Sequence, residues 1–184
     1  MVIPDFLTRG DGISIVSPAS SIIPDYVNGS VNILDGWALS VNIALNCFGK
    51  DGYYSGTIDE RMSDFRHALY DPAVKAVLCS RGGYGAVHLL DGLTDDIARN
   101  PKWIIGFSDI SALHALCVSR GVMSLHAPMC KHLTTEPADN RCTHYLRQIL
   151  FGEIPEYKEN PHPLNRCGEG RGMLVGGNMA VLCG

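Results

Sequence analysis

Short apolar runs alternate along the chain with longer segments in which apolar and polar residues are mixed. The first run, residues 13–16, ends at a turn-forming tetrad, residues 17–20, which is typical of a buried strand. The β-branched and apolar run at residues 74–79 predicts a strand covered on both faces. By the same pattern we expect strands at residues 13–16, 41–45, 74–79, 102–107 and 122–125.

The segments between these runs have the spacing of helices. The clearest begins at Asp59 and ends before Pro72, with apolar residues at i, i+3, i+6 and i+7. Its apolar stripe is Met62, Phe65, Ala68 and Leu69, and the side expected to face solvent is Asp59, Glu60, Arg61, Asp64 and Arg66. Further helices are predicted at residues 24–34, from residue 86 onward, and at residues 108–119 and 140–151.

Strands that alternate with helices predict an α/β fold, with a parallel sheet flanked by helices. In such sheets, ligands bind beyond the carboxyl ends of the strands. The residues that follow the predicted strands therefore form one candidate rim, which consists of residues 17–20, 80–85, 107–109 and His126.

The character of the chain changes after Pro137. We assign residues 1–151 to the α/β domain and residues 152–171, rich in Pro, Glu, Asn and Gly, to a linker. Residues 172–184 open with an apolar segment that has no following partner and cannot bury itself alone. We expect them to be the start of an incomplete, truncated C-terminal domain, whose exposed apolar surface would favour association such as a homodimer.

Composition and charge narrow the classes of partner. Fifteen Lys and Arg against 19 Asp and Glu give a net charge of −4 and a pI near 5.9, so no nucleic-acid partner is expected. No run reaches the roughly 18 apolar residues of a membrane span. Asp5, Arg9 and Asp11 interrupt the start of the chain, which does not resemble a secretory leader, so we expect no membrane contact and a cytoplasmic location.

The seven cysteines are widely spaced and contain no CxxC pair, which favours reduced thiols. Cys79 and Cys117 lie in apolar segments and are expected to be buried. His126, Cys130 and His132 match no standard zinc spacing, so no metal is expected.

Residues 106–109 lie where a predicted strand turns sharply into a helix. This is the setting of a nucleophile elbow, and Gly106 leaves room for the turn, although the second glycine of G-x-S-x-G is missing. Ser108 could equally be a helix N-cap. A strained backbone with the hydroxyl facing the Gly83 amide indicates catalysis, whereas a relaxed cap bonded to Ser111 indicates a structural role.

Residues 80–86 follow a buried strand and precede a helix, so their backbone amides could hold an anion or an oxyanion. They could equally form a tight turn in which Gly82 and Gly83 adopt positive φ. His88 stands where a G-x-G-x-x-G motif needs glycine, which argues against a dinucleotide cofactor. Arg81, at the carboxyl end of a strand, favours a carboxylate ligand.

Neither of two candidate histidines is a convincing base for Ser108. His114 lies six residues later on the same predicted helix, which at about 100° per residue puts it on the far side. His126 ends the next predicted strand, in a His-Ala-Pro turn that is more often structural.

Taken in order, these segments resemble the LD-carboxypeptidase family, the serine peptidases that include muramoyl-tetrapeptide carboxypeptidases and microcin self-immunity enzymes. The resemblance rests on residues 12–20, 59–61, 71–77, 80–86, 101–113, 126–129 and 172–178. Residues 126–129, His-Ala-Pro-Met, depart from the family's usual His-Gly-Pro-Met. The resemblance implies a flavodoxin-like or class I amidotransferase-like N-terminal domain, followed by a β-rich second domain.

The resemblance also implies roles for residues on the rim. Ser108 would be the nucleophile, and the backbone amides of Asp109 and Gly83 would form the oxyanion hole. Arg81 is expected to contact the terminal carboxylate of the substrate. The other expected substrate contacts are Gly82, Tyr84 and Ser17.

The family's reaction is attack of serine on the amide before a terminal D-amino acid of a murein tetrapeptide, without a metal or cofactor. Its triad is Ser, Glu and His, and the last two belong to the second domain, beyond Gly184. We therefore expect the isolated chain to be inactive. Two alternatives stay open: a microcin-immunity-type amidase on the same scaffold, and a non-catalytic α/β module that binds an anion at residues 82–85.

Overall fold

A five-stranded parallel sheet forms the centre of the molecule. The computed structural model describes residues 1–137 and 139–183. The strands are β1 (Gly12–Val16), β2 (Ser40–Ile43), β3 (Val74–Cys79), β4 (Trp103–Gly106) and β5 (Leu125–His126). They are hydrogen-bonded in the order β2-β1-β3-β4-β5, and each pair is parallel. This is the strand order of flavodoxin-like sheets, so the predicted fold class is confirmed.

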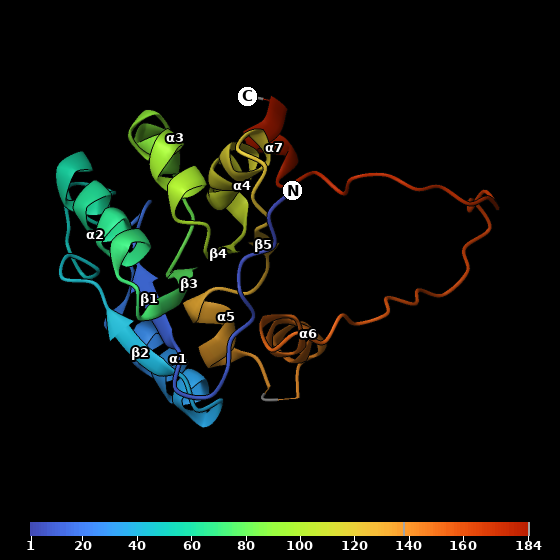
Figure 1. Ribbon diagram of the computed structural model, residues 1–184, viewed down its shortest axis with the longest axis horizontal. Coiled ribbons are helices and arrows are strands. Elements are labelled where there is room, and N and C mark those ends of the chain that lie inside the picture. The colour runs from blue at the N-terminus through green and yellow to red at the C-terminus, as the bar shows by residue number, and fades with distance from the viewer. Residues whose placement is uncertain (138, 184) are drawn as a thin grey trace.

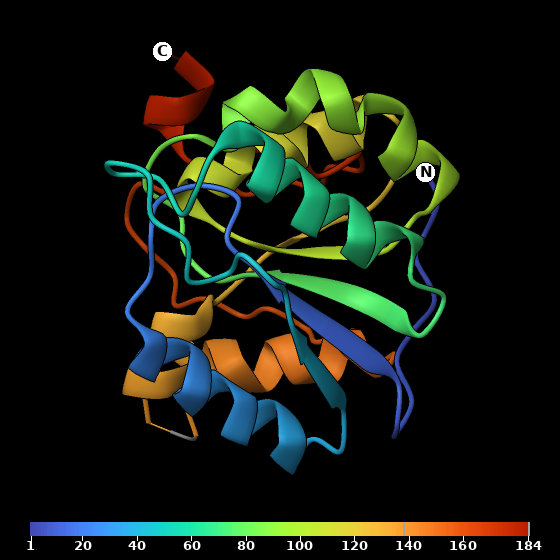
Figure 2. The same ribbon diagram turned by 90° about the vertical axis from the view of Figure 1, so that its left-hand side faces the viewer.

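Helices cover both faces of the sheet (Figures 1 and 2). On one face lie α2 (Ile58–Tyr70), α3 (Leu90–Arg99) and α4 (Ser111–Ser119). On the other lie α1 (Pro24–Gly36), α5 (Cys130–Thr135) and α6 (Arg141–Leu150). Each face has its own apolar core. Because both faces are covered, all five residues of β1 are buried.

Helix α2 confirms the predicted apolar stripe and corrects the predicted solvent side. Phe65, Ala68 and Leu69 are buried, as expected. Arg61 and Asp64, which we expected to face solvent, are only 2% and 6% exposed. Asp64 accepts hydrogen bonds from the backbone and side-chain amides of Asn46, each at 2.9 Å, and Arg61 donates to backbone carbonyls. Burial of both charges is therefore offset by hydrogen bonds that helical periodicity does not reveal.

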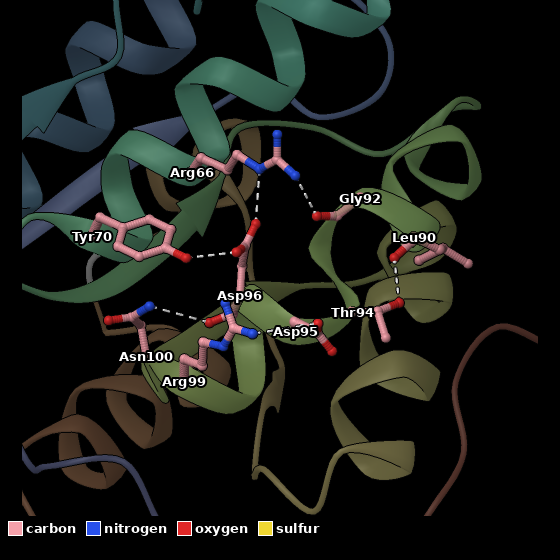
Figure 3. A network of polar contacts seen from close by, with 9 residues as sticks. All are labelled: Arg66, Tyr70, Leu90, Gly92, Thr94, Asp95, Asp96, Arg99 and Asn100. Atoms are coloured by element: carbon pink, nitrogen blue, oxygen red, sulfur yellow. Dashed lines mark hydrogen bonds and ion pairs between the residues drawn. The ribbon is translucent and has the colours of Figure 1, made fainter.

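Polar contacts tie the C-terminal half of α2 to α3 (Figure 3). Arg66 Nε donates to Asp96 Oδ2 at 2.8 Å, and Arg66 Nη2 donates to the Gly92 carbonyl at 2.7 Å. The Tyr70 hydroxyl donates to Asp96 Oδ1 at 2.6 Å. Burial alone would raise the pKa of Asp96, but the hydrogen bonds from Tyr70 and Arg66 together lower it. Asp96 is thus an ionised link between the two helices.

Most predicted elements differ from the structure by one or two residues at their ends, as β2 does, and the larger differences lie elsewhere. The fifth strand is Leu125–His126, not residues 122–125, because Val122 instead forms an isolated bridge with Val2. The segments expected to enter helices directly, from residues 86 and 108, first form the 3₁₀ turns η1 (Ala86–Leu89) and η2 (Ser108–Ile110). Helix α5 was not predicted at all, since its six residues are too few to show a helical period.

The chain beyond α6 differs from the rest. Residues 153–178 contain no described helix or strand and run far from the sheet before returning to α4 (Figure 1). Helix α7 (Met179–Cys183) then packs against α4. The Asn178 amide donates to Ser111 Oγ at 2.8 Å. The division into a domain of residues 1–151, a linker of residues 152–171 and a new domain from 172 to 184 stays a prediction, and within it Ala138 and Gly184 lie outside the described residues.

Two expectations from composition concern the whole chain. Within residues 1–137 and 139–183, no helix combines the length and the apolar character needed to cross a membrane. All seven cysteines are free, and Cys79 and Cys117 are buried, as predicted. Burial raises the pKa of the Cys117 thiol to about 12. This thiol therefore behaves as a small apolar group.

Candidate active site

Ser108 occupies the turn between β4 and α4. Its φ is +62°, and Ala38 is the only other described non-glycine residue with a positive φ. This conformation costs an L-residue about 1–2 kcal/mol. The turn is possible because Gly106 has no side chain: a Cβ there would lie 2.9 Å from Ile110 and 3.2 Å from Cys79. The predicted elbow geometry and the role of Gly106 are thus both present.

The structure does not use Ser108 as a helix cap. The residue in the cap position of η2 is Phe107, and no side chain caps this turn. Ser111, the expected bonding partner of a relaxed cap, instead accepts a hydrogen bond from the Asn178 amide. Among the hydrogen bonds of the described residues, none involves the half-buried Ser108 hydroxyl. Of the two interpretations of Ser108, the backbone favours the strained elbow.

The turn that follows β3 lies directly against this elbow. A Cβ on Gly82 would lie 3.1 Å from Ser108 Cβ and 3.2 Å from the Asp109 amide nitrogen. Gly82 is therefore needed for this close approach, and not for the positive φ that we predicted. Gly83 does have a positive φ, +109°. Within the described part of the chain, neither the Gly83 amide nor the Asp109 amide donates a hydrogen bond, so both can donate to an external oxygen.

The Asp109 side chain joins the elbow to that turn. Its carboxylate is 4% exposed and accepts a hydrogen bond from the Ala86 amide at 2.9 Å. This side chain therefore caps the start of η1 and not its own helix. Burial raises the pKa of Asp109, and the bond from Ala86 and the nearby His88 and Arg61 oppose this rise.

The predicted substrate contacts fall into two groups. Arg81 and Tyr84 are exposed, next to the elbow turn, and Arg81 Nη1 donates to the Ser21 carbonyl at 2.9 Å. Ser17 is only 3% exposed, and its hydroxyl is bonded to the Cys47 carbonyl at 2.7 Å and to Ser80 Oγ at 2.6 Å. The structure therefore places Arg81, Gly82 and Tyr84 on the rim with Ser108, and Ser17 beneath it.

The histidines near the elbow do not bond to Ser108 within the described residues. His114 Nε2 donates to the Gly106 carbonyl at 2.9 Å, and Nδ1 lies 2.8 Å from Ser124 Oγ. Burial lowers the pKa of His114 and keeps the ring neutral. His126 is exposed beside β4, paired in register with Gly106, and its ring lies 6.0 Å from that of Phe107. No group of three or more potential metal ligands was found among residues 1–137 and 139–183.

Two residues within the candidate segments received no role from the sequence, although the structure places them at this site. Ser20 lies under Gly83: its amide donates to the Gly82 carbonyl at 3.2 Å, and its hydroxyl accepts from the Tyr84 amide at 3.3 Å. Arg61 reaches the same turn from α2. Arg61 belongs to the family motif at residues 59–61, which could have indicated a buried role, whereas helical periodicity predicts it on the solvent side.

These features define an α/β domain with a strained serine at the carboxyl edge of its sheet. The chain belongs to the LD-carboxypeptidase family: that family's N-terminal domain matches residues 13–127. The chain is 32% identical to a probable murein peptide carboxypeptidase of Bacillus subtilis, over 97% of the chain and 58% of the relative. It is 39% identical to the microcin C7 self-immunity protein MccF of Escherichia coli, over 73% of the chain and 48% of the relative.

A solved structure supports the same assignment. The crystal structure of an MccF-like protein from Bacillus anthracis matches with a TM-score of 0.73 and 30% identity, over 82% of this chain and 47% of that one. The chain thus spans about half to three fifths of the length of these three proteins.

Proposed function

We propose that this chain is the nucleophile-bearing part of a serine peptidase that removes a terminal D-amino acid from a murein tetrapeptide. The observation that supports this most directly is the Ser108 backbone: a φ of +62° at a serine whose hydroxyl bonds to no described residue, with Gly82 against its Cβ. Strain at one serine that no structural hydrogen bond explains is typical of a functional position. We propose a cytoplasmic location for the reaction, as the sequence predicts.

The proposed reaction begins with attack of Ser108 Oγ on the carbonyl carbon of the last amide. The Asp109 and Gly83 amides would donate to the oxyanion as the tetrahedral intermediate forms. Expulsion of the protonated amine releases the D-amino acid and leaves an ester on Ser108. Water then cleaves this ester and restores the hydroxyl. Arg81, exposed beside the turn, would bind the terminal carboxylate of the substrate once its bond to Ser21 opens.

The attack requires a base that removes the proton of the hydroxyl. No described histidine forms a hydrogen bond with Ser108, and both ring nitrogens of His114 are bonded elsewhere, to Gly106 and Ser124. We propose that the base and its carboxylate partner, a His and a Glu by family resemblance, lie in a further domain. The relatives are considerably longer than this chain, which is consistent with such a domain.

The test uses the longer protein that contains this chain and a tetrapeptide ending in meso-diaminopimelate and D-alanine. Mass spectrometry should detect released D-alanine, and Ser108→Ala should lower the rate by about 10⁴-fold or more. The 184-residue chain alone should release none. Turnover by the chain alone would contradict the proposed second domain, and full activity of Ser108→Ala would contradict the nucleophile.

A second candidate is a self-immunity amidase that cleaves a peptidyl or aminoacyl amide outside the cell wall. The similarity to MccF and to the MccF-like structure of Bacillus anthracis favours it. Both candidates share Ser108 and the Gly82 turn, so the substrate distinguishes them. The same assay with an aminoacyl sulfamoyl nucleotide in place of the tetrapeptide separates the two: the preferred proposal predicts the higher kcat/KM for the tetrapeptide.

A further inference from the structure

Arg61 is a buried charge without a described carboxylate partner. It is 2% exposed, and within the described residues no Asp or Glu oxygen lies within 4.0 Å of its guanidinium. Its hydrogen bonds go to backbone carbonyls: Nε donates to Gly56 at 3.2 Å, and Nη1 donates to Pro18 at 2.7 Å and to Gly85 at 3.0 Å. Its guanidinium carbon also lies 5.0 Å from the centre of the Tyr54 ring.

These three carbonyls belong to three different segments at the carboxyl edge of the sheet. Pro18 is in the loop after β1, Gly56 precedes α2, and Gly85 ends the turn after β3. A guanidinium has five N–H donors in a rigid plane, so it can join acceptors that lie in different directions. Burying an ion pair or charge rarely adds stability over a packed apolar side chain. The main consequence of burying Arg61 is therefore that it holds these three carbonyls in a fixed arrangement, and not that it adds stability.

The turn joined to Arg61 is the one that lies against Ser108. At its start, the Gly82 carbonyl accepts from the Ser20 amide at 3.2 Å. At its end, the Ala86 amide donates to Asp109 at 2.9 Å, and the Gly85 carbonyl accepts from Arg61. The turn is thus fixed at both ends by its neighbours, while the Gly83 amide between them has no acceptor among the described residues.

We propose that Arg61 is a positioning residue that holds the turn of residues 82–85 against the Ser108 elbow, so that the Gly83 amide points to the reacting oxygen. This inference rests on the proposed function, since the Gly83 amide is an oxyanion donor only in that reaction. Among the described residues Arg61 has no hydrogen bond to Ser108; in this proposal it acts through the Gly85 carbonyl. A displaced oxyanion donor lowers kcat more than it weakens substrate binding, because its bond strengthens in the transition state.

The kinetic test compares Arg61→Met with Arg66→Met in the longer protein. Arg66 is a matched control: it lies five residues later on α2 and also donates to a glycine carbonyl, Gly92, but on the side of α3 (Figure 3). Arg61→Met should lower kcat about tenfold to hundredfold and change KM less than about threefold. Arg66→Met should leave kcat within about twofold. Equal kcat losses in the two variants would overturn the proposal.

A second measurement does not depend on activity. In ¹⁵N-labelled 184-residue chain, Arg61→Met should shift the Gly83 and Gly85 amide resonances and speed hydrogen exchange in this turn, while Arg66→Met leaves both signals in place. Unmoved Gly83 and Gly85 signals in Arg61→Met would overturn the proposal. If they move but the longer protein hydrolyses neither substrate, the proposed function fails and the positioning of the turn by Arg61 stands.

Should Arg61→Met not fold, Arg61→Lys provides the same two measurements. A lysine ammonium keeps the charge but cannot span the three carbonyls in one plane. It should therefore also lower kcat and shift the Gly83 signal. A kcat and a Gly83 signal equal to those of the unsubstituted protein would overturn the proposal, because the charge alone would then be sufficient.

Discussion

Two serines follow two strands of the same sheet, and they differ in burial, hydrogen bonding and backbone strain. After β1, the Ser17 hydroxyl is buried and bonded to Cys47 and Ser80, and the Ser17 carbonyl accepts from the Ser55 hydroxyl. After β4, Ser108 is half-buried, its backbone is strained, and its hydroxyl makes no hydrogen bond to a described residue. Both positions are at the carboxyl edge of the sheet, where ligands bind in this class of fold.

The difference separates a serine that holds the rim together from one that is available to a substrate. A buried hydroxyl with two partners contributes to stability, and removing it leaves those partners unsatisfied. A strained residue without such partners costs stability, and the rest of the fold must hold it in place. We therefore expect substitutions at the β1 loop to affect folding, and substitutions at the elbow to affect chemistry.

Among variants that keep the Ser108 side chain, the largest effect is expected where the elbow meets the Gly82 turn. In Gly82→Ala, the new methyl group would lie 3.1 Å from Ser108 Cβ and 3.2 Å from the Asp109 nitrogen, so the turn must move by a few tenths of an ångström. The activity of the longer protein should fall about tenfold to hundredfold. Gly36→Ala, where nothing lies within 4 Å, is the control and should keep full activity. Equal activities of the two variants would show that the close approach has no catalytic role.

The next effect is on folding at the β1 loop. Ser17→Ala leaves the Cys47 carbonyl and the Ser80 hydroxyl without a buried partner. The free energy of unfolding should fall by about 1–3 kcal/mol in a urea titration. Ser119→Ala removes an exposed hydroxyl whose one bond to a described residue is to the Leu116 carbonyl, and it should change the free energy of unfolding by less than about 0.5 kcal/mol. A Ser17 variant as stable as the Ser119 variant would remove the contrast between the two serines.

A smaller effect of opposite sign is expected at the elbow. Ser108→Gly relieves the positive φ and should raise the free energy of unfolding by roughly 0.5–1 kcal/mol, while the peptidase activity disappears. Ala38→Gly relieves a φ of +61° outside the candidate active site. It should raise the free energy of unfolding by a similar amount and leave the activity unchanged. Destabilisation by Ser108→Gly would mean that the serine side chain itself supports the fold.

The smallest effect is a pH dependence at His114, beneath the elbow. Burial lowers the pKa of this side chain below its ordinary value of about 6.5. As the pH falls, the imidazole is therefore protonated at a higher pH in the unfolded chain than in the folded chain. The stability that the neutral ring contributes is therefore complete above about pH 6.5 and is lost as the pH falls toward the folded-state pKa. In urea titrations, the stability difference between the unsubstituted chain and His114→Gln should shrink on acidification, by at most about 1.4 kcal/mol per pH unit. A constant difference would contradict the lowered pKa.

Much of the fold was predictable because its signals are local. Strands β1 and β4 are buried throughout, β3 is buried except at Lys75, and the apolar stripe of α2 follows helical spacing. The errors occurred where long-range contacts determine whether a side chain is buried. Arg61 and Asp64 read as solvent-facing because their acceptors and donors come from residues 18, 46, 56 and 85.

The candidate site shows the same division. Ser108, Gly106 and Gly83 were identified from residue type and position, and the family resemblance assigned the first its role. The pattern left Ser108 undecided between elbow and cap, because the two differ only in backbone conformation. The burial of Ser17 and the bond of Asp109 to Ala86 depend on which loops become neighbours at the sheet edge, and neither has a sequence signal.

The measurement that tests the central claim most directly is labelling of the longer protein with a fluorophosphonate, followed by mass spectrometry of its peptides. The account predicts one adduct, on Ser108, that is retained in Ser17→Ala and lost in Ser108→Ala. An adduct on another serine, or labelling that is unchanged in Ser108→Ala, would contradict the assignment of Ser108 as the nucleophile.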